Sequence, residues 1–312
     1  MNNKESCFVS AVVYVHNAES RLSGFLKMLI KVLGQNFDNS EIICVNDASD
    51  DGSVDVIRKI SSETEEACIT IVNTGCFHGL ELAMNAGVDL AIGDFVFEFD
   101  NTVMDYDESM IMKIYQHALT GFDIVSASPN RKTKLSSRVF YSLFEQNATV
   151  SYKLSTETFR ILSRRAINRI DSMNKTIPYR KAAYIASGMK LDTLKYDVKP
   201  VEPQKKNRRE SNYRFGLAVD TLILFTEVGY RFSFFMTSMM IIISLTMIIY
   251  TLLVFFLGNP IEGWTTTLLF LSVAFFGLFG ILTIIIKYLQ IIVDMVFKRK
   301  HYIIESIEKL TK

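Results

Sequence analysis

Residues 95–109 read FVFEFDNTVMDYDES, an apolar run that ends in a dense group of acids. The residues up to Phe99 are mostly apolar, as expected of a strand with a buried face. Four carboxylates follow within nine positions, at Asp100, Asp105, Asp107 and Glu108. Carboxylates this close together repel one another unless a cation or a set of donors neutralises them. The stretch therefore predicts a strand that carries an acidic, ligand-binding cluster at its end.

The first 125 residues alternate strand and helix patterns around this stretch. Strand-like runs are CFVSAVVYVHN (7–17), SEIICVNDASDDGS (40–53) and ACITIVNTG (67–75). Helix-like runs are ESRLSGFLKMLIKVLGQ (19–35), VDVIRKI (54–60) and GLELAMNAGVDLAIG (79–93). This alternation predicts βαβ units and a mostly parallel α/β sheet with Rossmann-like connections.

Polar residues follow three of the predicted strands, at His16–Asn17, Asn46–Asp47 and Asp100. Ligands of such sheets bind beyond the carboxyl ends of the strands. Turn chemistry alone explains polar residues at any one strand end. Three coinciding polar ends favour a binding site.

Two long apolar runs, 232–257 and 264–286, dominate the C-terminal part of the chain. Each exceeds the roughly 20 residues that cross a bilayer, so we expect a transmembrane hairpin joined by GNPIEG at 258–263. The alternative is a buried helical pair in a soluble protein. Residues 211–231 are amphipathic and aromatic, and predict an interfacial helix before the first span.

Basic residues flank only the outer ends of this hairpin, whereas the connection between the runs contains Glu262 as its one charge. The positive-inside rule therefore predicts that both termini, including a tail over 287–312, are cytoplasmic. The N-terminus shows no signal-peptide pattern, and four cysteines without metal spacing suit reduced thiols. A net charge of +1 gives no argument for nucleic-acid binding.

The order of these motifs resembles the GT-A family 2 glycosyltransferases. VVYVHNAES stands where that family has a PxYNE start, EIICVNDASDDGS where it has VDDGSxD, and AGVDLAIGDFVFEFD where it has AxGD leading to Asp-x-Asp. FRILSRRAINRI, ESNYR and the tail KYLQIIVDMVFKRKHYII resemble the branch that glycosylates polyisoprenyl phosphates. The resemblance covers nearly the whole chain and divides it into a GT-A domain (1–210), the interfacial helix, the two spans and the tail.

The resemblance implies a donor site and a metal site. Val15, Asn17, Asp47 and Asp100 would contact a nucleotide-diphosphate sugar. Asp100, Thr102 and Asp105 would hold Mg²⁺ or Mn²⁺, although Thr102 replaces the second acid of the motif and Asp105–Asp107 offers a displaced version of it. A divalent cation would offset the charge of the leaving diphosphate.

The resemblance also implies an acceptor site and a catalytic set. Arg131, Lys132, Arg138 and Arg160 are the candidates to hold the lipid phosphate, and Asp100, Asp105 and Arg160 are the candidate catalytic residues. Ala18, Ala48, Thr158 and Asn212 depart from the family pattern. The expected function is inverting sugar transfer to a polyprenyl phosphate at the cytoplasmic face of the inner membrane, for cell-surface glycan synthesis, with a possible homo-oligomer.

Two alternatives remain open from the sequence. One is a transferase acting on another lipid or on a saccharide. The other is a catalytically weak, membrane-tethered protein that binds nucleotide sugars or serves assembly, which the departures from the family motifs favour. The sequence names neither the sugar nor the nucleotide.

Overall fold

The structure is a computed structural model that describes residues 4–64, 67–131, 157–173, 180–200, 264–297 and 302–310, with 216, 235–236, 239–240, 242 and 246. Nearly all of the predicted interfacial helix, most of the first predicted span and its connection to the second lie outside the described residues. Lys132, Arg138 and Asn212 also lie outside them.

The strands form one mixed, eight-stranded sheet with the order β7-β5-β6-β4-β1-β2-β3-β8. Their bounds are β1 (Glu5–Val15), β2 (Phe37–Asn46), β3 (Cys68–Thr74), β4 (Phe95–Phe99), β5 (Ile124–Pro129), β6 (Phe159–Ser163), β7 (Leu191–Tyr196) and β8 (Ile304–Lys309). The β1–β4 strands pair in parallel, whereas β6 and β8 pair with their neighbours in antiparallel fashion. The structure confirms the predicted α/β class and the four predicted strands, β1 to β4.

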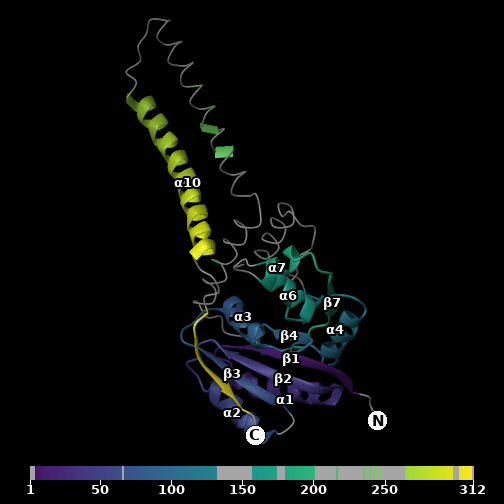
Figure 1. Ribbon diagram of the computed structural model, residues 1–312. Coiled ribbons are helices and arrows are strands. Elements are labelled where there is room, and N and C mark those ends of the chain that lie inside the picture. The colour runs from purple at the N-terminus through teal and green to yellow at the C-terminus, as the bar shows by residue number, and fades with distance from the viewer. Residues whose placement is uncertain are drawn as a thin grey trace, which may run out of the picture. The chain divides into compact units, whose positions relative to one another are not determined.

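Helices cover both faces of the sheet, which explains why its central strands are apolar on both sides. One core cluster joins the sheet to α1 (Glu19–Asn36), α2 (Ser53–Glu63) and α4 (Ser109–Leu119). The other joins it to α3 (Leu80–Leu90), α6 (Arg164–Ser172) and α7 (Arg180–Ala186). Figure 1 shows α1 and α2 on one side of the sheet and α3, α6 and α7 on the other.

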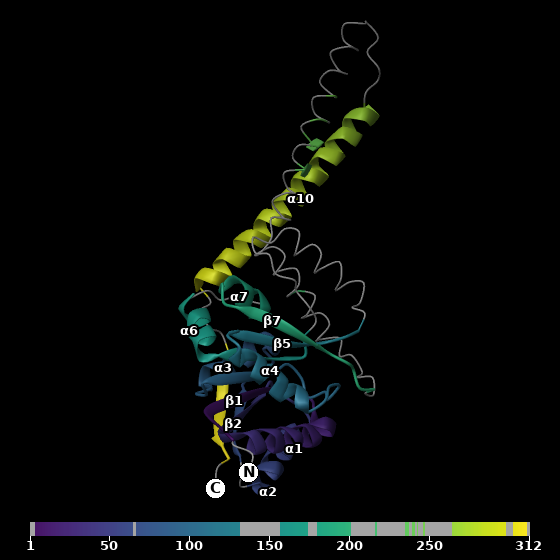
Figure 2. The same cartoon turned by 90° about the vertical axis from the view of Figure 1, so that its right-hand side faces the viewer.

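The strand order reverses at β1, because β2 and β3 follow on one side and β4 lies on the other. In an open α/β sheet, the crevice at such a reversal is the usual ligand position. The sequence pattern gave no sign of β8, which extends the sheet beside β3. Figures 1 and 2 show β8, in yellow, along that outer edge.

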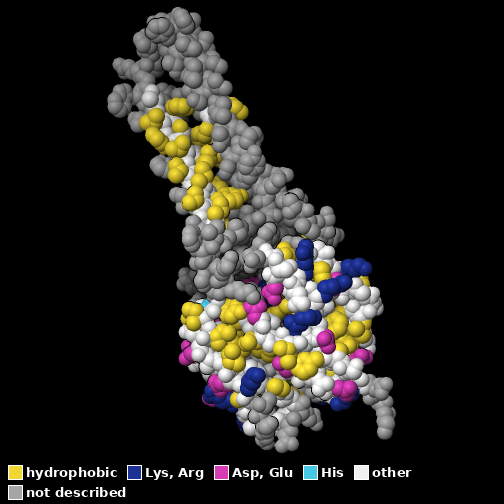
Figure 3. Space-filling view, viewed as in Figure 1, with side chains coloured by type: hydrophobic (Ala, Val, Ile, Leu, Met, Phe, Trp, Pro, Cys, Tyr) yellow, Lys and Arg dark blue, Asp and Glu magenta, His cyan; other side chains and the backbone are white. Residues whose placement is uncertain are grey.

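The chain forms two compact units. One contains Met1–Tyr141, Tyr152–Leu217 and Lys300–Lys312, and the other contains Ser142–Ser151 and Ala218–Arg299. In the first unit, Figure 3 shows acidic and basic side chains interspersed over the visible face.

In the second unit, α10 (Trp264–Phe297) contains the whole of the second predicted span. It exposes large apolar side chains along its length, among them Leu271, Phe275 and Leu289. No helix in the described part of the chain combines the length and the apolar character that crossing a membrane requires.

Candidate active site

Two acids, Glu98 in β4 and Asp100 just after it, lie on one face of the sheet. Side chains alternate along a strand, so Phe97 and Phe99 enter the core beneath α1 and α4, whereas Glu98 and Asp100 face the opposite side. Glu98 is 1% exposed. A buried acid requires a partner, and the antiparallel register places Arg160 of β6 directly opposite Glu98.

Two arginines hold the Asp100 carboxylate, one at each oxygen. Arg160 Nη2 lies 2.6 Å from Asp100 Oδ2, and Arg180 Nη2 lies 2.7 Å from Asp100 Oδ1. The side chains of Arg160 and Arg180 are 0% and 4% exposed, and that of Asp100 is 11% exposed. The acidic end of β4 is therefore neutralised by guanidinium groups from β6 and α7.

Further carboxylates complete this buried cluster. Glu98 Oε2 lies 2.8 Å from Arg160 Nη1 and 2.7 Å from Arg180 Nη1, and Glu98 also accepts a hydrogen bond from the Tyr184 hydroxyl. Glu81 of α3 accepts from the backbone N–H and the Nε of Arg180. Two of the close contacts, Arg160 Nε to Glu157 at 3.3 Å and Arg180 Nη1 to Glu98, are ion pairs without hydrogen-bond alignment.

The cluster fixes the protonation of its members. Burial raises the pKa of Asp100, but the charges of Arg160, Arg180 and Lys181 outweigh it, so the pKa stands below its usual value. Burial opposes the charge of Arg160, yet Asp100 and Glu98 raise its pKa. Asp100 is therefore ionised at neutral pH.

Arg180 and Tyr184 were missed by the sequence analysis, because α7 belongs to no motif recognised there. The available signal was Glu98, an acid inside an apolar strand. Arg160 was predicted to hold an acceptor phosphate, and that role stays a prediction. The geometry does not favour it, since the side chain is fully buried and its nitrogens face three carboxylates.

Asp105 and Thr102 are buried, at 6% and 3% exposed. Asp105 Oδ1 accepts a hydrogen bond of 2.7 Å from the Tyr196 hydroxyl of β7, which is itself 2.5 Å from Thr158 Oγ1. Because Tyr196 donates to Asp105, Thr158 must donate to Tyr196. Burial, together with Asp105, raises the pKa of Tyr196 and keeps the phenol protonated. Thr158, which departs from the family pattern, thus forms a hydrogen bond with the Tyr196 hydroxyl.

The predicted metal set of Asp100, Thr102 and Asp105 stays a prediction. Among the described residues, no three His, Cys, Asp or Glu side chains are arranged to hold a metal ion. Asp100 nevertheless fits a divalent cation, because it is ionised, slightly exposed and has a lone pair left on each oxygen. Mg²⁺ at phosphate sites commonly takes one or two carboxylates, with substrate oxygens and water completing its coordination.

Asp47, at the end of β2, uses its carboxylate to fix a neighbouring loop. It is 0% exposed and accepts hydrogen bonds from the Tyr14 hydroxyl, from Thr74 and from the backbone N–H groups of His78 and Gly79. We call residues 75–79, between β3 and α3, the donor loop. The predicted contact of Asp47 with a nucleotide stays a prediction, and the structure gives this side chain a loop-organising role.

Two non-glycine residues adopt left-handed backbone conformations beside Asp47. Asn17 has φ of 48° and Ala48 has φ of 47°. Ala48 is one of the residues that depart from the family pattern, and its positive φ is a conformation that favours glycine. Asn17 is held by its side chain, which accepts from the Asp50 N–H, while the Val15 carbonyl accepts from the Asp47 N–H.

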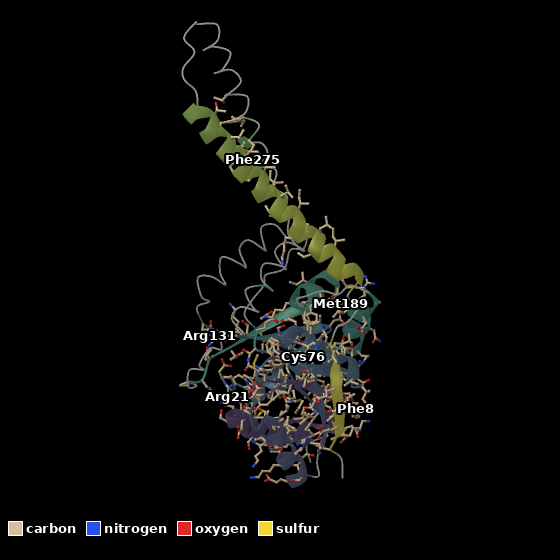
Figure 4. The ribbon with its side chains drawn as sticks, turned by 90° about the vertical axis from the view of Figure 1, so that its left-hand side faces the viewer. Phe8, Arg21, Cys76, Arg131, Met189 and Phe275 are labelled. Carbon is tan, nitrogen blue, oxygen red and sulfur yellow. The ribbon has the colours of Figure 1, made fainter. Side chains whose placement is uncertain are left out.

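An aromatic pair borders this strand-end region. The rings of His16 and Phe77 lie 4.8 Å apart, and His16 Nδ1 donates to the Asp47 carbonyl. Arg131, a predicted acceptor contact, follows the end of β5 and is exposed; Figure 4 shows it apart from Cys76 of the donor loop. Asp47, Asp100 and the polar end of β1 thus follow the three strands that are neighbours at the reversal.

These features define an open α/β protein with an acidic site at the point where its strand order reverses. The chain belongs to glycosyl transferase family 2, whose model matches residues 10–185, more than half of its length. The protein is accordingly a glycosyltransferase.

Similarity to one relative extends over nearly the whole chain. The chain is 26% identical over 311 residues to the SfII prophage-derived bactoprenol glucosyl transferase of Shigella flexneri, covering 96% of this chain and 97% of the relative. It is 31% identical over 126 residues to the undecaprenyl-phosphate 4-deoxy-4-formamido-L-arabinose transferase of Aeromonas hydrophila, covering 40% and 38%. A solved mannosyltransferase from Pyrobaculum calidifontis, in complex with GDP-Man and Mn²⁺, is 15% identical over 70% of this chain and 64% of its own, with a TM-score of 0.49.

Proposed function

We propose that this protein transfers a sugar from a nucleotide diphosphate to a polyprenyl phosphate. The supporting observation is Asp100, an ionised carboxylate at the strand reversal of a family 2 sheet, in a chain whose full-length relative is named a bactoprenol glucosyl transferase. The relative from Aeromonas hydrophila is named for an undecaprenyl-phosphate acceptor, which favours the same acceptor class.

The donor would bind across the carboxyl ends of β1, β2 and β4. The donor loop and the turn at Ala48 would shape the nucleotide end, and the His16–Phe77 pair offers apolar ring surface there. Asp100 would hold Mg²⁺ or Mn²⁺, which would supply charge compensation for the diphosphate. Arg160 and Arg180 keep Asp100 ionised and fixed in orientation.

The acceptor would supply the attacking oxygen. A phosphate monoester is ionised near neutral pH, so its oxygen attacks the anomeric carbon without prior removal of a proton, and the bond from that carbon to the diphosphate breaks. The nucleoside diphosphate leaves with the electron pair. Positioning and electrostatics carry most of such a reaction, and attack from the opposite side inverts the anomeric centre.

We place the reaction at the cytoplasmic face of the inner membrane. The apolar runs at 232–257 and 264–286, with basic residues at their outer ends only, support this location. The exposed Arg131 stays a candidate for the lipid phosphate, together with Lys132 and Arg138.

The test is a donor screen with purified full-length protein in detergent. Labelled UDP- and GDP-sugars are incubated with undecaprenyl phosphate, with and without Mg²⁺ or Mn²⁺, and the lipid phase is extracted. We expect label in the lipid for one donor, dependent on the cation. Transfer only to a saccharide or to another lipid would instead identify the other transferase. Donor binding without transfer to any acceptor would favour the binding protein.

A further inference from the structure

Ile303, the residue that precedes the C-terminal strand β8, is hydrogen-bonded to the donor loop through both of its backbone groups. The Ile303 carbonyl accepts a hydrogen bond of 3.0 Å from the Gly75 N–H. The Ile303 N–H donates to His78 Nε2, also at 3.0 Å. Residues 302–310, which we call the tail segment, therefore contact the first and fourth residues of the donor loop.

These bonds fix the state of the His78 ring. Since Nε2 accepts from a backbone N–H, it carries no proton, and the ring proton must sit on Nδ1. Nδ1 lies 2.6 Å from the Cys76 carbonyl, to which it donates. The imidazole thus bridges the tail segment and the donor loop as a neutral ring with both nitrogens used.

The same loop is held from its other side by Asp47. The N–H groups of His78 and Gly79 each donate to that carboxylate at 2.8 Å. Gly79, the residue before α3, has φ of 82°, a conformation that favours glycine. The loop is therefore fixed between Asp47, beneath the proposed donor, and the tail segment at the sheet edge.

Side chains anchor the tail segment independently of the loop. Arg58 of α2 binds both oxygens of Glu308, at 3.0 and 3.1 Å. Asn73 donates to Ser306 and Glu308 and accepts from Asn46 at the end of β2. Tyr302 donates to Asp89 of α3. These contacts hold Ile303 in place even where its own side chain, 64% exposed, packs little.

We propose that the tail segment is a positioning element for the donor, acting through Ile303 and His78 on the donor loop. The inference rests on the proposed function, because it takes the donor loop as part of the nucleotide site. Only four residues separate Phe297, where α10 ends, from the start of the tail segment. The nucleotide end of the site would therefore depend on a segment from the opposite end of the sequence.

The test removes a single backbone N–H group, that of Ile303, just before β8. Ile303→Pro deletes the N–H that binds His78, and Ile303→Ala is the matched control, which keeps the N–H and removes the exposed side chain. A neutral hydrogen bond contributes about a three- to tenfold effect. We expect Ile303→Pro to weaken binding of UDP or GDP, whichever binds the wild-type protein, and raise the donor KM by that factor, with kcat and the acceptor KM unchanged.

His78→Leu and His78→Gln give a second route if Ile303→Pro does not fold. Leucine removes the acceptor and should reproduce the donor defect, whereas glutamine offers a side-chain oxygen and should restore part of it. Equal donor KM values for Ile303→Pro and Ile303→Ala, or a parallel rise in the acceptor KM, would overturn the proposal. A wild-type protein that binds neither nucleotide would instead overturn the proposed donor itself, before any variant is compared.

Discussion

The Asp100 carboxylate forms ion pairs with two arginines and is also the proposed metal ligand. Its substitution should therefore affect both stability and transfer. Asp100→Asn keeps the size of the side chain but removes the charge between Arg160 and Arg180. Breaking a buried ion pair costs about 3–5 kcal/mol, a large part of a typical stability of about 5–15 kcal/mol. We expect loss of transfer together with a lower thermal midpoint, measured by activity and by unfolding in detergent.

Asp107→Asn is the matched control, because Asp107 belongs to the same acidic stretch but pairs with Lys199 at the surface. It should match the wild-type protein in both measurements. Stability of Asp100→Asn equal to wild type would contradict the ion cluster. The pH dependence has a definite sign: the folded-state pKa of Asp100 is lowered, so its stabilisation is complete above about pH 4 and is lost as the pH falls through the folded-state value.

Two buried tyrosines, Tyr106 of the acidic stretch and Tyr196 of β7, should respond differently to loss of their hydroxyls. Tyr196→Phe removes the donor to Asp105, and a hydrogen bond to a charged group contributes about 1.5–3 kcal/mol. Tyr106→Phe removes a buried hydroxyl that has no hydrogen-bond partner among the described residues, so its cost should be near zero or favourable. Chemical denaturation of both variants checks this, and equal losses would contradict the assigned network.

At the scale of elements, α3 approaches the sheet at a glycine. A Cβ at Gly87 would lie 2.3 Å from Val12 Cγ1 and 2.6 Å from Val45 Cγ2, so Gly87→Ala must move α3 away from β1 and β2. Overpacking of this kind costs about 1–3 kcal/mol. Because α3 follows the donor loop, the variant should also raise the donor KM, as measured by initial rates.

Gly24→Ala in α1 is the comparison, since its Cβ would meet only Met104 at 3.5 Å, an ordinary contact. Alanine is the better helix former, so this variant should gain about 0.5–1 kcal/mol of stability. The two substitutions should therefore change the free energy of unfolding in opposite directions. A destabilised Gly24→Ala or a neutral Gly87→Ala would show that helix packing differs from the arrangement described.

Elements β1 to β4 and α1 to α3 could be predicted from the sequence because their patterns are local and repeat in order. The antiparallel strands β6 and β8 were not predicted, because both lie outside the alternating strand and helix patterns of the first 125 residues, and β8 is an edge strand with no fully buried residue. The same limit applies to the site. Asp100 could be predicted from its strand end, whereas its partner Arg180 is 80 residues away and enters through α7.

In the proposed topology, the connection at 258–263 lies on the external side of the membrane, and the globular unit lies on the cytoplasmic side. A cysteine introduced by Glu262→Cys should therefore react with an impermeant maleimide in intact cells. Cys76 is exposed in the globular unit and should react only after the cells are permeabilised, because that unit is cytoplasmic in this topology.

Cys44 is the internal reference for folding in this labelling experiment. It is fully buried, and burial raises the pKa of its thiol to about 12, so it should stay unmodified on either side of the membrane until the protein is denatured. Reaction at Cys44 in native cells would mean that the labelled population is unfolded. If Cys44 stays unmodified, two results would contradict the proposed orientation: labelling of Cys76 before permeabilisation, or labelling of Glu262→Cys only after it. The proposed reaction would then lie at the other face of the membrane.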